Sequence, residues 1–149
     1  MRPLYETDKD FENEKRIKRQ IEQEKEWKLT KLPKRYYLDF FAFTPRFGQL
    51  IAVLEVKRRH NTHDKYPDVI LSLAKYMKGA EYADALNVDF LFAVQFNDGL
   101  YIHEGGNLTL QHLQITFGGR TDRNDPEDIE PVVHIPVKAL FTKLGEKNE

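Results

Sequence analysis

Three charged residues interrupt two apolar segments that are typical of neighbouring buried strands. Asp39 lies within the run at residues 36–43, and Glu55 and Lys57 lie at the end of the next run. An ionised group in such a setting is costly to bury unless a partner or a metal ion compensates its charge. Two carboxylates with a lysine beside them therefore suggest a site that binds a cation and acts on a phosphate.

The expected cation is Mg²⁺ or Mn²⁺, because both prefer oxygen ligands and keep waters for a substrate phosphate. Asp39 and Glu55 would supply carboxylate ligands, and the carbonyl of Val56 would supply a third. Lys57 would hold or deprotonate the attacking water and stabilise charge on the scissile phosphate. The expected reaction is metal-assisted hydrolysis of a phosphodiester bond.

The turn between the two strands decides whether the carboxylates meet. Glu55 and Lys57 are two apart, so they face the same side of their strand. A three-residue loop at residues 46–48 would place Asp39 opposite Glu55, with Cβ atoms roughly 5 Å apart. A four-residue loop would place Asp39 opposite Leu54 and turn it to the wrong face. The glycine at position 48 suits the three-residue turn with a bulge, but the sequence leaves both registers open.

Helices and further strands must position these residues. Residues 8–26 predict a helix, because they are rich in Glu, Lys, Arg and Gln and lack Gly and Pro. A second helix is expected from Tyr66-Pro67-Asp68 to about residue 86, with Pro67 near its first position. The expected strands span residues 27–32, 35–44, 49–59 and 88–96, and a hairpin at 97–99 leads into a strand at 100–103.

This order predicts an α/β (α+β) fold in which helices flank a central mixed β-sheet. Consecutive strands without a crossover pair antiparallel, and the second helix returns the chain for a further strand. We expect one domain over residues 1–149, with its core at about 8–104, because neither a repeat nor a linker divides the chain. The remainder should add a strand at 108–117, a loop at 118–131, a short strand at 132–135 and a helix at 136–144.

Glu14 is a further candidate for the site. The apolar residues Phe11, Ile17 and Ile21 lie within about 60° of Glu14 on a helical wheel. Glu14 therefore lies in the middle of the face that should meet the core. The alternative is a solvated charge, since this helix is full of charged residues.

A basic segment surrounds the charged strand, although the net charge of the chain is −1. Residues 31–78 hold ten basic and four acidic residues. Arg58, Arg59 and Lys65 directly follow the Glu-Val-Lys sequence, where a DNA phosphate backbone would pass. His60 and His63 have the spacing of a metal pair, but two loop histidines without further ligands do not predict a metal site.

The composition excludes several classes of protein. With 149 residues and 40% hydrophobic content, the chain can form a real core. It has no cysteine, which excludes disulfide bonds and thiolate metal sites. No apolar run approaches the ~20 residues that span a bilayer, and the N-terminus has no apolar signal region. We therefore expect a cytoplasmic protein with no membrane partner.

Asp39 and Glu55-Val56-Lys57, on adjacent strands between two helices, resemble the motif of the PD-(D/E)XK nuclease superfamily, whose fold is restriction-endonuclease-like. The likeness is greatest to small members, such as archaeal Holliday-junction resolvases and short phage nucleases, and covers roughly residues 8–104. It implies that Asp39 and Glu55 hold the metal and that Lys57 serves the water. Glu14 matches the helical glutamate that many members add, and Lys75 is the candidate for a polar residue of the second helix.

The resemblance has departures and further implications. Leu38 stands where many members have proline, and the literal Pro67-Asp68 pair follows the Glu-Val-Lys and reads as a helix start. Residues 24–28 contain a second Glu-x-Lys, but that copy lies in a polar helix and has no paired aspartate. Because many relatives dimerise, a homodimer is an expectation, and the small size suggests a phage origin and action in the host cytoplasm.

The leading hypothesis is a Mg²⁺- or Mn²⁺-dependent deoxyribonuclease that binds DNA. A second hypothesis keeps the fold without catalysis, as a nucleic-acid-binding or assembly protein. A third is a structural or interaction protein whose charged cluster is closed by internal salt bridges. The preferred DNA structure or sequence cannot be read from these residues.

Overall fold

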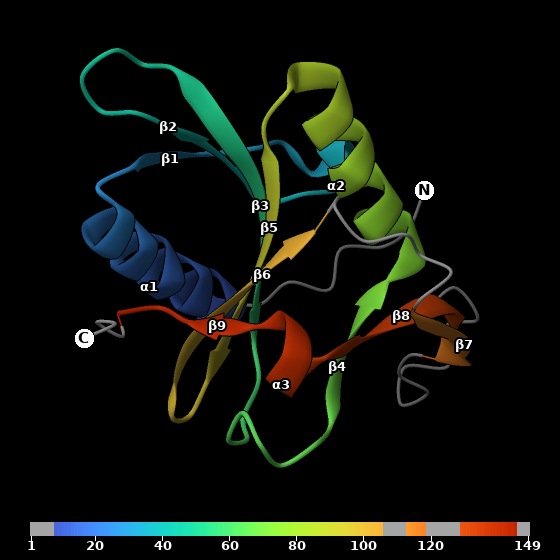
Figure 1. The fold of residues 1–149 in the computed structure, drawn as a ribbon. Helices are drawn as coiled ribbons and strands as arrows, with labels where there is room; N and C mark the ends of the chain where they lie inside the picture. The colour runs from blue at the N-terminus through green and yellow to red at the C-terminus, as the bar shows by residue number, and fades with distance from the viewer. Residues whose placement is uncertain (1–7, 106–112, 119–128, 146–149) are drawn as a thin grey trace.

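A mixed sheet forms the centre of the molecule (Figure 1), as predicted. The computed structural model describes residues 8–105, 113–118 and 129–145. The sheet has six strands in the order β1-β2-β3-β5-β6-β9, and β3 and β5 are parallel while the other neighbours are antiparallel. Its strands are β1 (Lys28–Lys31), β2 (Phe40–Phe43), β3 (Leu50–Arg58), β5 (Asp89–Phe96), β6 (Gly99–Gly105) and β9 (Thr142–Lys143).

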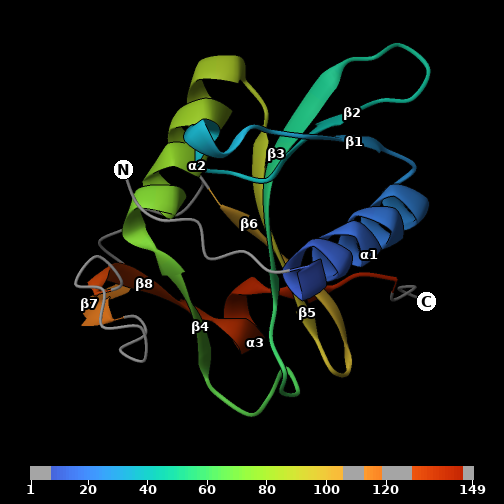
Figure 2. The ribbon, with the colours of Figure 1, turned by 180° about the vertical axis from the view of Figure 1, so that it is seen from behind.

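Two helices, α1 (Asp8–Lys25) and α2 (Leu73–Leu86), flank this sheet on opposite sides (Figures 1 and 2). Ile17 and Ile21 of α1 belong to the apolar cluster on one face, and Tyr76 of α2 belongs to the cluster on the other. A Cβ atom at position 79 of α2 would lie 2.6 Å from the ring of the buried Phe90. Glycine at this position therefore lets α2 lie close against β5.

The alternation of β3 directs the charged residues toward α2. Val53 belongs to the apolar cluster that includes α2, and Leu54 belongs to the cluster that includes α1. Since side chains alternate along a strand, Glu55 and Lys57 share the face of Val53. The charged pair thus lies between the sheet and the second helix.

The β2–β3 turn corrects one expectation and confirms another. The N–H of Thr44 donates to the carbonyl of Gln49 at 2.9 Å, so residues 45–48 form the four-residue loop, the alternative that would have turned Asp39 away from Glu55. A β-bulge at Ile51 then restores the register, because Phe43 pairs with Leu50 while Phe40 pairs with Leu54. Asp39 consequently lies beside Glu55, as the shorter loop would have placed it.

The strand predicted at 35–44 is wrong in its first half. Lys34–Tyr36 form a 3₁₀ helix, Tyr37 adopts a left-handed conformation with φ 71°, and β2 begins only at Phe40. Tyr36 and Tyr37 are 37% and 55% exposed, which shows that they are not covered as residues of a buried strand would be. Instead, the N–H of Tyr37 donates to the carbonyl of Lys34 at 2.9 Å and closes the turn.

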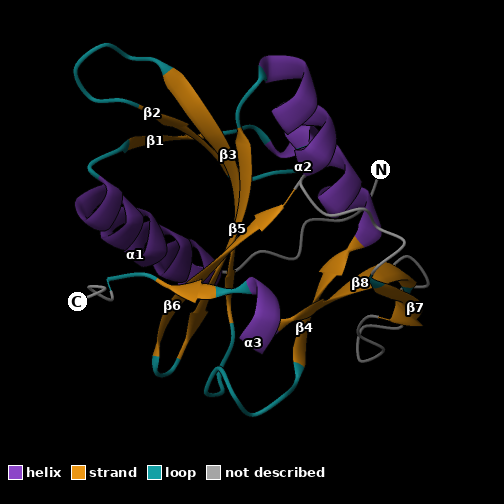
Figure 3. Cartoon of the chain, in the orientation of Figure 1, coloured by secondary structure: helices purple, strands orange, loops and turns teal. Residues whose placement is uncertain are grey.

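The predicted start of the second helix is also wrong. The Pro67-Asp68 pair leads into β4 (Asp68–Ser72), whose Val69 and Leu71 are buried. This strand pairs with β8 (Glu130–Pro136), which pairs with β7 (Gln114–Gly118), and the three form a second sheet that was not expected (Figure 3). The helix begins after Ser72, whose Oγ accepts from the N–H of Lys75 at 3.4 Å.

The C-terminal helix expected at 136–144 is a single turn, α3 (Val137–Leu140), followed by the edge strand β9. The N–H of Leu144 donates to the carbonyl of Leu100 at 2.7 Å, so pairing with β6 satisfies backbone groups that a longer helix would have used. Parts of the strand expected at 108–117 and of the loop expected at 118–131 lie outside the described residues. Within the described residues, no helix has the length and apolar character needed to cross a membrane.

Candidate active site

The carboxylate of Asp39 is held beside β3 by backbone hydrogen bonds. The N–H of Asp39 donates to the carbonyl of Leu54 at 2.9 Å, and its carbonyl accepts from Leu32 at 2.8 Å. Its Oδ2 accepts from the N–H of Val56 at 2.9 Å. Because β2 begins only at Phe40, the Val56 N–H is bound by this carboxylate and not by a strand.

Glu55 is buried at 3% exposure and is only half satisfied. Its Oε2 accepts from the Nζ of Lys75 at 2.8 Å. Its Oε1 is buried, and no donor reaches it within the described part of the chain. The side chain meets that of Asp39 only through a hydrogen bond that requires a proton on one of the two carboxyl groups. Native proteins rarely leave a buried carboxylate oxygen in this state, because losing its hydration is costly. The residues fit a cation, which would bind this oxygen.

The two carboxyl groups differ sharply in acidity. Burial, and then the charge of Asp39, raise the pKa of Glu55 well above its ordinary value, although Lys75 opposes this. Burial alone would raise the pKa of Asp39, but the hydrogen bonds of Glu55 and Val56 and the charges of Lys31 and Lys75 lower it. Glu55 therefore retains a proton more readily while Asp39 keeps its negative charge.

Lys57 has a perturbed pKa on the same face of β3. Burial, and then the nearby charge of Arg59, lower the pKa of Lys57 to about 8. A lysine with such a pKa exists partly as the neutral amine near physiological pH. It can therefore accept a proton, which an ordinary surface lysine does not do.

Lys31 belongs to the site, and the sequence analysis missed it. Its Nζ lies 2.5 Å from Oε1 of Glu14 and 3.3 Å from Oδ1 of Asp39. Burial would lower the pKa of Lys31, but its bonds and charge interactions with Glu14 and Asp39 raise it. Glu14 thus approaches Asp39 with an ammonium group between them. The structure pairs Lys31 with Phe40, directly beside Asp39, and this register cannot be read from the sequence.

The residues expected to meet DNA phosphates have different surroundings. Lys75 is bound to Glu55. It therefore belongs to the group of charged side chains around Asp39 and Glu55, called the carboxylate cluster below. Arg58 is held internally, because it donates to the carbonyl of Gln95 at 3.0 Å and to Oδ1 of Asn97 at 2.7 Å. Arg59 is half-buried, and Lys65 is exposed. Of these residues, Arg59 and Lys65 remain the better placed to reach a phosphate.

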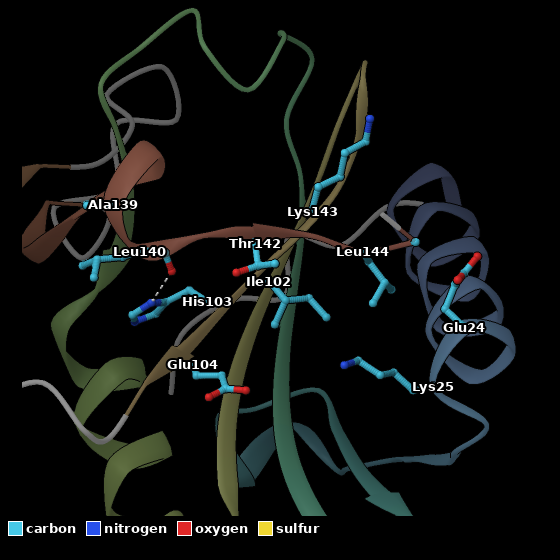
Figure 4. A pocket seen from close by; sticks show the side chains of 11 residues that line it. Glu24, Lys25, Ile102, His103, Glu104, Ala139, Leu140, Thr142, Lys143 and Leu144 are labelled. Carbon is cyan, nitrogen blue, oxygen red and sulfur yellow. Dashed lines mark hydrogen bonds between the residues drawn. The ribbon is translucent and has the colours of Figure 1, made fainter. Parts of the chain in front are cut away.

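Two other features lie apart from the carboxylate cluster. A hollow of 620 Å³ separates the end of α1 from the β6–β9 edge, where Nδ1 of the buried His103 bonds the carbonyl of Leu140 (Figure 4). Ligand atoms of His63, Asp64 and Asp98 lie within 4.8 Å of one another on the surface after β3. His60, which the sequence pairs with His63, is not part of this group.

Comparisons with known proteins identify the family of this chain and its fold. Residues 1–144 match the model of a family described as "Phage putative PDDEXK endonuclease". A similar solved structure is that of Hjc, a Holliday junction resolvase from the archaeal hyperthermophile Archaeoglobus fulgidus. It is 15% identical in sequence, has a TM-score of 0.59, and the match covers 95% of this chain and 99% of that chain. The comparison with curated proteins found no match.

Proposed function

The chain belongs to the phage PDDEXK endonuclease family, and from this premise we propose that it is a Mg²⁺- or Mn²⁺-dependent deoxyribonuclease. The observation that carries the proposal is the buried, unpartnered Oε1 of Glu55 beside the ionised carboxylate of Asp39. Such an arrangement favours a divalent cation over a closed internal salt bridge. The fold shared with a Holliday junction resolvase is consistent with DNA as the substrate.

Asp39, Glu55 and the carbonyl of Val56 would hold the metal in this proposal. The metal, when bound, supplies the charge that activates water and stabilises the phosphate. Lys75 keeps the carboxylate of Glu55 oriented through its bond to Oε2. The N–H of Val56 does the same for Asp39. Glu14 would assist from α1, and Lys31 would balance its charge when the metal is absent.

Lys57 would handle the proton of the attacking water. Its lowered pKa lets the neutral amine accept that proton, and the resulting ammonium would stabilise charge on the phosphate. Arg59 and Lys65, which follow on the chain, would contact flanking phosphates, and Arg58 would hold the end of β3 in place. We also propose that residues 1–149 form one domain and that the protein acts in the cytoplasm. A homodimer stays a prediction.

Cleavage of a DNA panel tests this proposal. The panel contains duplex, single-stranded, nicked, flap and four-way-junction DNA, each with Mg²⁺, with Mn²⁺ and with EDTA. Wild type should cleave at least one substrate only with metal, and Glu55→Gln and Lys57→Met should each lose at least about 10²-fold in rate. Glu104→Gln, at an exposed glutamate of β6, is the matched control and should keep wild-type activity.

Two outcomes would contradict the proposal in different ways. Metal-independent, salt-sensitive DNA binding that Glu55→Gln leaves intact, without cleavage by wild type, would identify a catalytically silent binding protein. Absence of both cleavage and DNA binding would indicate a structural protein. Equal activity of wild type and both site variants would mean that a different site performs the chemistry.

A further inference from the structure

Tyr37 has a backbone conformation that its side chain disfavours. Its φ of 71° and ψ of −21° lie in the left-handed region, which glycine and asparagine adopt readily and bulky residues rarely adopt. The turn itself needs only the N–H of Tyr37, which donates to the carbonyl of Lys34 at 2.9 Å. Residues held in such conformations cluster at active sites and ligand-binding segments. Tyr37 ends the 3₁₀ turn, where glycine or asparagine would adopt the left-handed conformation at a lower cost, so the tyrosine ring requires explanation.

The Tyr37 ring is exposed and lies beside a lysine. It is 55% exposed, and the Nζ of Lys78 lies 5.6 Å from its centroid. The neighbouring Tyr36 is 37% exposed, with the guanidinium of Arg35 at 5.4 Å from its centroid. An exposed aromatic ring with a cation beside it is suited to binding a nucleotide. The base stacks on the ring, and the cation attracts the phosphate of the nucleic-acid backbone.

The aromatic surface formed by Tyr36 and Tyr37 adjoins the carboxylate cluster. Tyr37 lies two residues before Asp39, and Lys78 lies one helical turn after Lys75, which bonds Glu55. Residues three apart on a helix share a face, so Lys75 and Lys78 project from the same side of α2. The same helix face therefore contacts Glu55 through one lysine and Tyr37 through the next.

We propose that Tyr37 is a positioning residue that stacks on an unpaired base next to the scissile phosphate. The substrate class would be DNA with unpaired bases at the cut, such as flaps, bubbles, branch points or single strands. A fully paired duplex buries its base faces within the stack and offers none to the ring. This inference rests on the proposed nuclease function, because it assumes that the carboxylate cluster acts on DNA.

Substituting Tyr37 by glycine gives a clean test, since glycine tolerates the left-handed backbone and only the ring is lost. Tyr37→Phe keeps the ring and is the matched conservative variant. Phe47→Ala is the control for a general loss of aromatic surface, because Phe47 is 83% exposed at the far turn and carries Arg46 5.5 Å from its ring. Thermal denaturation should show Tyr37→Gly to be at least as stable as wild type.

Binding is measured in EDTA, where the proposed nuclease does not cut. The two probes are a DNA with one unpaired 2-aminopurine and its fully paired counterpart. Wild type, Tyr37→Phe and Phe47→Ala should prefer the unpaired probe and quench its 2-aminopurine fluorescence. In Tyr37→Gly this preference should fall by about five- to 150-fold, and the quenching should disappear.

The outcomes separate this inference from the proposed function. If Tyr37→Gly keeps the preference and the quenching, or if wild type has no preference, the stacking role is wrong even when metal-dependent cleavage is observed. If quenching depends on Tyr37 but wild type cleaves no DNA with either metal, the base-stacking role holds, while its link to a scissile phosphate and the proposed nuclease function both fail. If Phe47→Ala loses as much of the preference for the unpaired probe as Tyr37→Gly, the effect comes from non-specific binding to exposed aromatic residues, and the inference is wrong.

Discussion

Substituting Glu55 by glutamine should stabilise the metal-free protein while it abolishes cleavage. Glu55 is 3% exposed, and its Oε1 is buried without a hydrogen-bond partner among the described residues. A glutamine side chain has nearly the same shape and no charge. Its amide oxygen can accept from Lys75, and its NH₂ group can donate to the carboxylate of Asp39. The substitution thus removes the unmet requirement of a buried carboxylate.

The size of the effect follows from two opposing contributions. An unsatisfied buried polar atom costs about 1–3 kcal/mol, which the substitution would recover. The lost ion pair with Lys75 offsets about 0–1 kcal/mol, because the Lys75 side chain is 42% exposed and can be hydrated. The net gain is about 0–3 kcal/mol. Its central range of about 1–2 kcal/mol corresponds to about 2–8 °C in the unfolding midpoint of a chain of this size.

The gain should depend on pH in a defined direction. The pKa of Glu55 is raised in the folded protein, mainly by burial. The stability that the neutral carboxyl contributes is present below its unfolded pKa and is lost as pH rises through the folded pKa. The glutamine side chain stays neutral throughout, so the advantage of the variant should be larger at pH 9 than at pH 5.

Thermal denaturation in EDTA, at several pH values, measures this prediction. Adding Mn²⁺ should raise the midpoint of wild type and leave that of Glu55→Gln almost unchanged, because the variant has lost a metal ligand. Glu104→Gln, at an exposed position of β6, should shift the midpoint little in either condition. A Glu55→Gln protein that is less stable than wild type in EDTA at every pH would refute the reasoning, since Glu55 would then be a structural ion-pair partner.

Two further predictions concern the lysines. NMR of labelled lysines should detect one amine with a pKa of about 8, and this signal should be absent from Lys57→Met. The same variant should cleave about 10²–10⁴-fold more slowly without binding metal more weakly. A signal that persists in Lys57→Met would contradict the assignment. Lys31→Met should lower the metal-free unfolding midpoint and increase the rise that Mn²⁺ produces, because the cation then compensates Glu14 and Asp39 alone. Equal metal-induced shifts in wild type and Lys31→Met would show that Lys31 does not affect the metal.

The sequence predicted the carboxylate pair because a buried charge is conspicuous in an apolar strand. Asp39, Glu55 and Lys57 each interrupt an apolar run, and this pattern survives even when the surrounding elements are misjudged. The pairing of Asp39 with Glu55 was correct for a reason that the sequence did not reveal. The turn is the four-residue alternative, and a bulge at Ile51 shifts the register of β3 by one residue, which restores the pairing.

The elements that were misjudged depend on contacts between distant parts of the chain. Residues 68–72 form a strand because they pair with residues 132–136, which lie 60–68 positions away in the chain. Local propensity at Pro67-Asp68 suggested a helix start instead. The chain similarly leaves its helix after Leu140 because β6 offers an unpaired edge. Such pairings satisfy backbone groups that a sequence pattern cannot assign to partners.

Lys31 and Lys75 show what the acidic motif alone does not convey about the electrostatics of the site. Glu14 and Asp39 face Lys31, and Glu55 faces Lys75, so each acid has an ammonium group within 3.3 Å. With Glu55 disposed to hold a proton, the metal-free cluster carries no large negative charge. A divalent cation that enters it must displace a proton or a lysine, which weakens binding of the metal alone. A DNA phosphate brings the missing negative charge, so metal and DNA should each strengthen the binding of the other at this site.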